Sequence, residues 1–137
     1  MIASVIEMGS LIACVSVLLA ILAVSFWRAL RAEGRAWRML TSLLTEAELR
    51  QLASKGYLEI PSPSAPGRAY RIPRRAGRVR MYEDGRLVCE LCLQPTIFLP
   101  PSDLVMLHKF LIEGDEATYL ATANRFPSSL YLPYWAG

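Results

Sequence analysis

The sequence is poor in the residues that build metal and redox sites. It contains one histidine, His108, and three cysteines among 137 residues. A structural zinc ion needs four ligands, and Cys14 falls within a long apolar stretch. Cys89 and Cys92 are three positions apart in a strand-like run, so they should point to opposite faces of a sheet. We therefore expect free thiols, no metal and no cofactor.

Patterns typical of catalysis are also lacking. His108 lies in the helical pattern LVMLHKFLIE, and no serine or cysteine nucleophile with an orienting acid can be placed beside it. No glycine-rich phosphate loop follows a strand-like run. His108 is therefore expected to be a partly buried or surface residue, and the chain is not expected to be an enzyme.

Charge is absent between Met8 and Trp27, in the stretch MGSLIACVSVLLAILAVSFW. At about 1.5 Å rise per residue, a helix of this length covers the ~30 Å hydrocarbon core of a bilayer. A secretory signal peptide is the alternative, but signal peptides begin with a positive region, and here Glu7 precedes the stretch without any Lys or Arg. We predict a transmembrane helix with a helical extension over residues 1–44.

The positive charges that follow the stretch predict its orientation. Arg28, Arg31, Arg35 and Arg38 lie just after it, and short flanks rich in Lys and Arg stay in the cytoplasm. The N-terminus is therefore expected outside and the C-terminal part inside. Trp27 and Trp37 are expected at the cytoplasmic interface, which favours indole rings.

Small residues recur along one side of the predicted span at intervals of four, three, four and three. This spacing aligns them on a single helical stripe. Small side chains allow another helix to approach closely in lipid, so we expect a transmembrane helix of another subunit as partner, with a lone anchor as the alternative. The stripe residues are Gly9, Ala13, Ser16, Ala20 and Ala23.

The following residues predict a small α+β domain over residues 45–124. Thr45 followed by Glu48 is a capping box and Gly56 suits a helix end, so a short helix is expected between them. Strand-like runs then alternate with turn signals, and two helical patterns close the domain. The strands are expected at 57–60, 68–72, 78–83 and 86–94, and the helices at 102–114 and 115–124. The predicted architecture is an antiparallel sheet flanked by short helices.

The segment RRAGRVRMYEDGRLVCELCLQP predicts a hairpin that turns at Asp84 and Gly85. A two-residue turn would place arginines on the apolar side of the sheet. A three-residue loop with Gly85 in the left-handed conformation pairs Tyr82 with Arg86 and separates the faces, so we predict this register. The residues that it turns inward are Val79, Met81, Leu87, Cys89, Leu91 and Leu93.

Arginine is concentrated around this hairpin. The region faintly resembles the last helix and wing of a winged helix, but the chain has a net charge of only +3 and lacks a second preceding helix to read DNA. Nucleic acid is therefore disfavoured, and a cytoplasmic protein surface or anionic lipid headgroups are the expected partners. The residues expected to bind are Arg68, Arg71, Arg74, Arg75, Arg78 and Arg80.

The last residues, 125–137, are predicted to form an aromatic tail. A free tail is normally polar, because exposed aromatic side chains gain nothing from water. The tail therefore either folds back over its own sheet or contacts a partner, and we favour the partner. The residues expected to make this contact are Phe126, Tyr131, Tyr134 and Trp135.

Residues 45–124 include the runs GYLEIPSPSAPGRAYRIPRRAGRVRMYEDGRLVCELCLQP and LPPSDLVMLHKFLIEGDEATYLATAN. They resemble a small uncharacterised α+β domain of predicted proteins of high-GC bacteria. The resemblance implies a bacterial chain, and hence the inner (cytoplasmic) membrane for its single span. It implies no activity and no site residues.

These features together predict an accessory or assembly subunit of a larger membrane complex, without catalytic activity. Respiratory and photosynthetic complexes often include small one-span subunits and are compatible hosts. The alternative is a membrane-tethered regulator whose basic hairpin binds nucleic acid or anionic headgroups.

Overall fold

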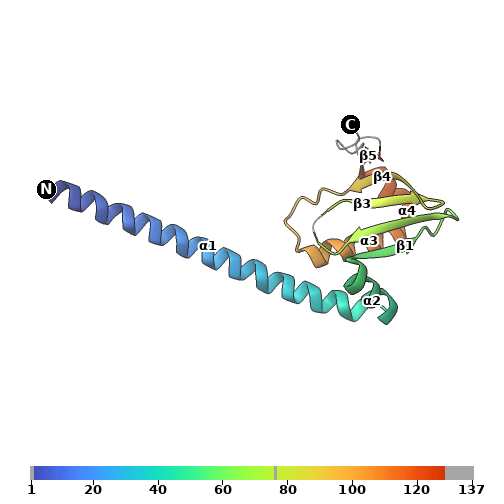
Figure 1. Cartoon of the computed structure of the whole chain (residues 1–137), viewed down its shortest axis with the longest axis horizontal. Coiled ribbons are helices and arrows are strands. Elements are labelled where there is room, and N and C mark those ends of the chain that lie inside the picture. The colour runs from blue at the N-terminus through green and yellow to red at the C-terminus, as the bar shows by residue number, and fades with distance from the viewer. Residues whose placement is uncertain (1, 76, 129–137) are drawn as a thin grey trace, which may run out of the picture.

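The chain begins as one long helix that leads directly into a small α+β domain (Figure 1). The structure, a computed structural model, describes residues 2–75 and 77–128, and side chains among these from Leu11 onward. Helix α1 runs over Ile2–Leu43, and its N-terminal part projects away from the domain.

Helix α1 is long and apolar enough to cross a membrane. Its stretch Leu11–Leu43 has the required length and composition, and the apolar part is exposed along its whole length. Signal sequences near an N-terminus share these properties. Length and composition therefore establish the capacity to span a bilayer and leave the orientation open.

The C-terminal quarter of α1 belongs to the domain core. Leu40 is fully buried and Ala36 nearly so, because this part of α1 packs against helix α3, Pro101–Gly114, and Leu44 just after α1 is buried as well. Trp37 is half-buried against the same core, beneath the guanidinium of Arg74 at 4.4 Å from its ring. Core packing thus begins within α1, ahead of residue 45, and Trp37 packs against this core.

Helix α2, Glu46–Lys55, forms as its local signals predict. The hydroxyl of Thr45 accepts a hydrogen bond from the backbone N–H of Glu48, whose carboxylate accepts one from the Thr45 N–H at 2.8 Å. Gly56 ends the helix with φ of 73°, a left-handed conformation that glycine adopts without steric cost. The capping box and the helix end are confirmed.

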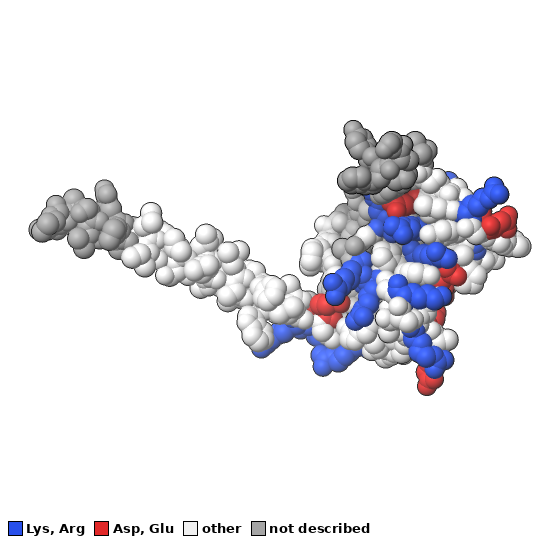
Figure 2. Space-filling model, viewed as in Figure 1, with Lys and Arg blue, Asp and Glu red and all other residues white. Residues whose placement is uncertain are grey.

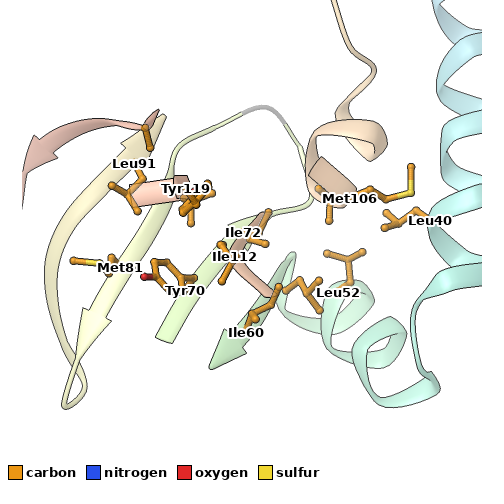
Figure 3. Close-up of a cluster of buried hydrophobic side chains, with 14 of the residues drawn as sticks. Leu40, Leu52, Ile60, Tyr70, Ile72, Met81, Leu91, Met106, Ile112 and Tyr119 are labelled. Carbon is orange, nitrogen blue, oxygen red and sulfur yellow. The ribbon is translucent and has the colours of Figure 1, made fainter. Parts of the chain in front are cut away.

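A five-stranded antiparallel sheet follows, with the strands in sequence order. Helix α3 and the short helix α4, Glu116–Thr122, cover one face of it. The strands are β1 Tyr57–Pro61, β2 Arg68–Pro73, β3 Val79–Glu83, β4 Arg86–Cys92 and β5 Asn124–Pro127. The core runs from this inner sheet face, through Tyr70 and Tyr119, to Leu40 on α1 (Figure 3). The predicted α+β class with its antiparallel sheet is confirmed.

The hairpin between β3 and β4 turns differently from the prediction. Asp84 and Gly85 form a two-residue turn, both with positive φ, and Glu83 pairs with Arg86. A bulge then shifts the register, so that Tyr82 lies opposite Leu87 and Met81 opposite Cys89. The extra residue, Val88, restores the inward direction of the later apolar side chains. Leu87 therefore shares a face with Tyr82 and does not point inward as predicted.

The sheet continues past residue 124. Strand β5 pairs with β4, with Phe126 opposite Glu90 and Arg125 opposite Leu91. The first residues of the predicted tail are thus the edge strand of the sheet. Pro127 is compatible with this place because a proline at a strand end or edge removes no inner hydrogen bond.

Replacing Leu40 with alanine should destabilise the domain although residue 40 lies in α1. The change removes a fully buried side chain from the α1–α3 contact, and we expect the free energy of unfolding to fall by about 2–5 kcal/mol. Urea denaturation of the full chain in detergent micelles measures this. The matched control is Met39→Ala, since Met39 is exposed. Equal effects of the two substitutions would contradict the assignment of this part of α1 to the core.

Candidate functional site

His108 is buried within the domain in a chain of aromatic side chains. Its Nδ1 lies 3.0 Å from the hydroxyl of Tyr119, whose ring meets that of Tyr70 edge to face with centroids 6.0 Å apart. Burial lowers the pKa of His108 to about 4 and raises that of Tyr119. The imidazole is therefore neutral at physiological pH and serves to fill and orient the core.

The carboxylate of Glu116 is the most densely hydrogen-bonded acid among the described residues. It accepts hydrogen bonds from the hydroxyls of Ser62, Ser64 and Tyr70, and the guanidinium of Arg68 lies 3.4 Å away. Burial alone would raise the pKa of Glu116, but the hydrogen bonds from Ser64, Tyr70 and Ser62 outweigh it and lower the pKa to about 2. The group stays ionised and ties α4 to β2 and to the loop before it.

The cysteines take the places predicted from the strand period. Cys89 is buried in the core, where burial raises the pKa of its thiol, and Cys92 lies half-buried on the other face of β4. Both are free thiols. Within residues 11–75 and 77–128, no group of three or more His, Cys, Asp or Glu side chains is arranged to hold a metal ion.

No helix within residues 2–75 and 77–128 covers the outer face of the sheet, and this face carries an ordered row of side chains. Lysine and arginine side chains gather over this part of the domain in Figure 2. One row crosses all five strands, each member lying opposite the next. Its members are Glu59, Arg71, Arg80, Glu90 and Phe126. Two arginines thus stand side by side in the middle of the sheet, each with a glutamate on its outer side.

Each arginine of the row is held by its neighbouring acid. The Nε atom of Arg71 lies 2.6 Å from Glu59, and the Nε atom of Arg80 lies 3.2 Å from Glu90. Arg78 also contacts Glu90, at 3.4 Å, and its guanidinium lies 3.7 Å from the centre of the Phe126 ring. The acids therefore fix the arginines in place, while the three arginine side chains remain 37–57% exposed.

A groove of about 520 Å³ opens on this face. The guanidinium of Arg71 lies 4.3 Å from the ring centre of Tyr82 and 5.0 Å from that of Tyr57 on the other side. Such cation–π contacts hold both partners in one geometry. The groove is lined by Gly56, Tyr57, Arg71, Pro73, Gly77, Arg78, Arg80, Tyr82 and Glu90. We call this the arginine–tyrosine groove.

The structure divides the six arginines predicted to bind a partner. Arg71, Arg78 and Arg80 line the groove. Arg74 lies over Trp37, and Arg75 is exposed in the loop between β2 and β3. Arg68 stands apart, because its guanidinium lies 2.8 Å from Glu83 and reaches Glu116 on the inner side. Its role is structural.

The predicted aromatic contact residues fall into two groups. Phe126 lies in strand β5 opposite Glu90, with the Arg78 guanidinium over its ring, and its contact with a partner stays a prediction. Tyr131, Tyr134 and Trp135 lie outside the described residues.

The stripe residues stay on the surface of α1. Ala13, Ser16, Ala20 and Ala23 are exposed in the continuous helix, so their spacing does align them, and the Ser16 hydroxyl donates to the Ile12 carbonyl at 2.8 Å. Gly9 lies in the same helix, where side-chain surroundings are not described. A partner for the stripe stays a prediction.

The sequence analysis gave no binding role to four members of the outer face: Tyr57, Glu59, Tyr82 and Glu90. Alternation of side chains along single strands indicated which face they occupy. Their association with the arginines depends on cross-strand register, which places Arg71 beside Glu59 and Arg80 beside Glu90. The available signal was that Tyr57 and Tyr82 flank the arginine-rich stretch of the sequence.

The low pKa of Glu116 predicts a loss of stability in acid. A carboxyl whose pKa is lowered on folding stabilises the folded state above its unfolded pKa, and this contribution is lost as the pH falls toward the folded value. For Glu116 the window runs from 4.5 to about 2, and the contribution is about 3 kcal/mol. Neutral His108 adds a loss in the same direction between 6.5 and about 4.

Urea denaturation of the full chain in micelles, repeated from pH 7 to pH 2.5, measures this dependence. Glu116→Gln should be less stable than the native chain at pH 7 and should show a flatter decline below pH 4.5. A variant that declines as steeply as the native chain would show that Glu116 does not carry the acid sensitivity.

Comparisons with known proteins do not identify a function for this surface. The chain matches no protein-family model, no curated protein and no solved structure. The resemblance of residues 45–124 to a bacterial α+β domain therefore stays a prediction, and what the chain binds must be inferred from its own surfaces.

Proposed function

We propose that the chain is a non-catalytic accessory subunit of a membrane complex, which holds a protein partner on the arginine–tyrosine groove. Helix α1 anchors it with a single span in a bacterial inner membrane, and the domain lies in the cytoplasm. The observation that carries this proposal is the outer sheet face, which no described helix covers and on which two neighbouring arginines are fixed beside tyrosines.

The composition of the groove suits a protein partner. Arginine and tyrosine are enriched at the energetic centres of protein interfaces, because they supply large contact areas and fixed donors. In the groove these side chains are already held by Glu59, Glu90 and their cation–π contacts, so little ordering is needed on binding. An acidic segment of a partner would complement the exposed guanidinium groups.

Single-stranded nucleic acid fits this face less well. Proteins that bind it on a sheet offer free aromatic rings for base stacking. Here the rings of Tyr57 and Tyr82 flank the Arg71 guanidinium, and Glu59 and Glu90 place negative charge where phosphates would lie. A regulator that binds nucleic acid is therefore the second candidate.

The anchoring part of the proposal rests on α1. Its apolar part is exposed along its whole length, whereas a core helix of the same composition would be buried. The arginines that follow, from Arg28 onward, support a cytoplasmic domain by the positive-inside rule.

Neutralising the groove tests the proposal. In the triple variant Arg78→Gln, Arg80→Gln and Glu90→Gln, the buried carboxylate and both of its cations are replaced together by amides. The domain should therefore remain folded, without an unpaired buried charge. We expect the proteins that co-purify with the native chain from its own membranes in mild detergent to be lost.

The matched control changes Arg50, Arg86 and Glu46 to Gln, which alters the net charge equally at exposed positions away from the groove. Co-purification should persist in this control. Binding of the native chain to a single-stranded oligonucleotide, weakening steeply with salt and abolished in the groove variant, would instead establish the nucleic-acid candidate.

The stripe on α1 gives a separate prediction. Ala20→Leu should reduce co-purification, because a larger side chain prevents close approach of a partner helix, whereas Leu18→Ala should have a smaller effect. Quantitative mass spectrometry of the detergent-purified complex compares the two variants. Equal losses would count against a small-residue contact and favour a lone anchor.

A further inference from the structure

The loop between β4 and α3 exposes apolar side chains to an unusual extent. Ile97 is 67% exposed and Phe98 87%, and no large apolar side chain among the described residues, those of α1 included, is more exposed than Phe98. A soluble surface gains nothing from such a pair at a loop tip. We call residues 96–99 the apolar loop.

The apolar loop lies on the side of the domain that faces the proposed span. In Figure 1 the segment between β4 and α3 reaches along α1 toward its N-terminal half. Phe98 and Leu99 share a groove of about 370 Å³ with Ala32 and Arg35 of α1. The loop therefore has a defined level along the helix.

The end of the loop is fixed at this level. The carboxylate of Glu33 accepts hydrogen bonds from the hydroxyl and the backbone N–H of Ser102, at 2.5 and 3.2 Å. Pro100 and Pro101 restrict the chain just before this point. The position of the loop relative to α1 is thus set by direct contacts between the two segments.

The near end of this groove corresponds to the headgroup region. The α1 residues that line the groove run from Ala32 to Met39, and Ala32 lies five residues beyond Trp27, the end of the uncharged stretch, or about 7.5 Å further along the helix axis. The headgroup region on each side of a bilayer is roughly 5–7 Å thick. Arg28 and Arg31 lie in between, and the guanidinium of Arg31 is 5.8 Å from the Trp27 ring, an arrangement suited to a membrane interface.

We propose that the apolar loop is a second membrane contact, with Ile97 and Phe98 inserted at the boundary between headgroups and acyl chains beside α1. The inference rests on the proposed membrane anchoring. Aromatic and aliphatic side chains next to basic residues are the composition that binds this boundary. Two contacts, one helix and one loop, hold the domain against the bilayer in a single orientation.

Fluorophores attached to single cysteines in full-length protein, reconstituted in phosphatidylcholine–phosphatidylglycerol vesicles, test the proposal. The background carries Cys14→Ala, Cys89→Ala and Cys92→Ala, and the label is placed by Phe98→Cys. We expect lipids with a spin label near the headgroup to quench the fluorophore at residue 98. We also expect aqueous iodide to quench this fluorophore at least threefold less than it quenches the same fluorophore on the unfolded chain without micelles. The matched control is Phe110→Cys, a half-exposed phenylalanine further along α3, whose label should stay open to iodide.

A third label, placed by Leu19→Cys in the apolar part of α1, separates the two proposals. Quenching of this label by lipids with a spin label deep in the acyl chain, together with full iodide access at residue 98, would overturn the second contact and leave the span intact. A residue 98 label shielded from iodide without any lipid quenching would also overturn it, because a protein surface would then cover the loop. Loss of lipid quenching at residue 19 would overturn the anchoring itself.

Discussion

The contact between the end of α1 and the start of α3 determines how the molecule is built. Leu40 and Ala36 are buried against α3. The N-cap residue Pro100 has no side chain that could accept a hydrogen bond from the start of α3, and the Glu33 carboxylate takes this role by accepting hydrogen bonds from the N–H and the hydroxyl of Ser102. A helix that would otherwise be a separate anchor is thereby made part of the core. The level of the apolar loop beside α1 follows from this one contact.

The two faces of the sheet have different physical roles. On the inner face, Tyr70, Tyr119 and His108 fill the space beneath α3 and α4, and the hydrogen-bonding groups of Glu116 are satisfied within the domain. On the outer face, ion pairs and cation–π contacts hold arginines that remain partly open to water. The groups with the largest pKa shifts therefore lie within the fold, whereas the arginines that we propose to bind a partner lie on the outer face.

Local signals in the sequence were enough to predict α2, the strands of the two hairpins and the long apolar helix. The capping box at Thr45 acts within one turn, and strand alternation acts within a few residues, so neither needs knowledge of the partner segments. The bulge at Val88 was missed because nothing in its own residue type distinguishes it from a regular strand residue. Strand β5 was missed because the short run NRFP pairs only through its place beside β4.

The same distinction applies to the candidate site. The excess of arginine around the hairpin was visible in composition, and it predicted a binding surface. Which arginines share that surface depends on register and on strand order, and these turn Arg68 inward to Glu116 while Arg71 and Arg80 stand side by side. The pairing of strands therefore determines which arginines line the groove, and the residue pattern of a single strand does not predict this pairing.

The absence of a break in α1 links two surfaces that lie far apart. Each residue of an α-helix turns its successor by about 100°, so the direction of the stripe around Ala20 and the direction of the arginine–tyrosine groove are related by a fixed angle. One residue added near Gly34 would rotate the domain by about that angle around the span, whereas seven added residues would nearly restore it. A complex that held both surfaces at once would have to match this angle, so α1 would act as a rigid alignment element between the stripe and the groove.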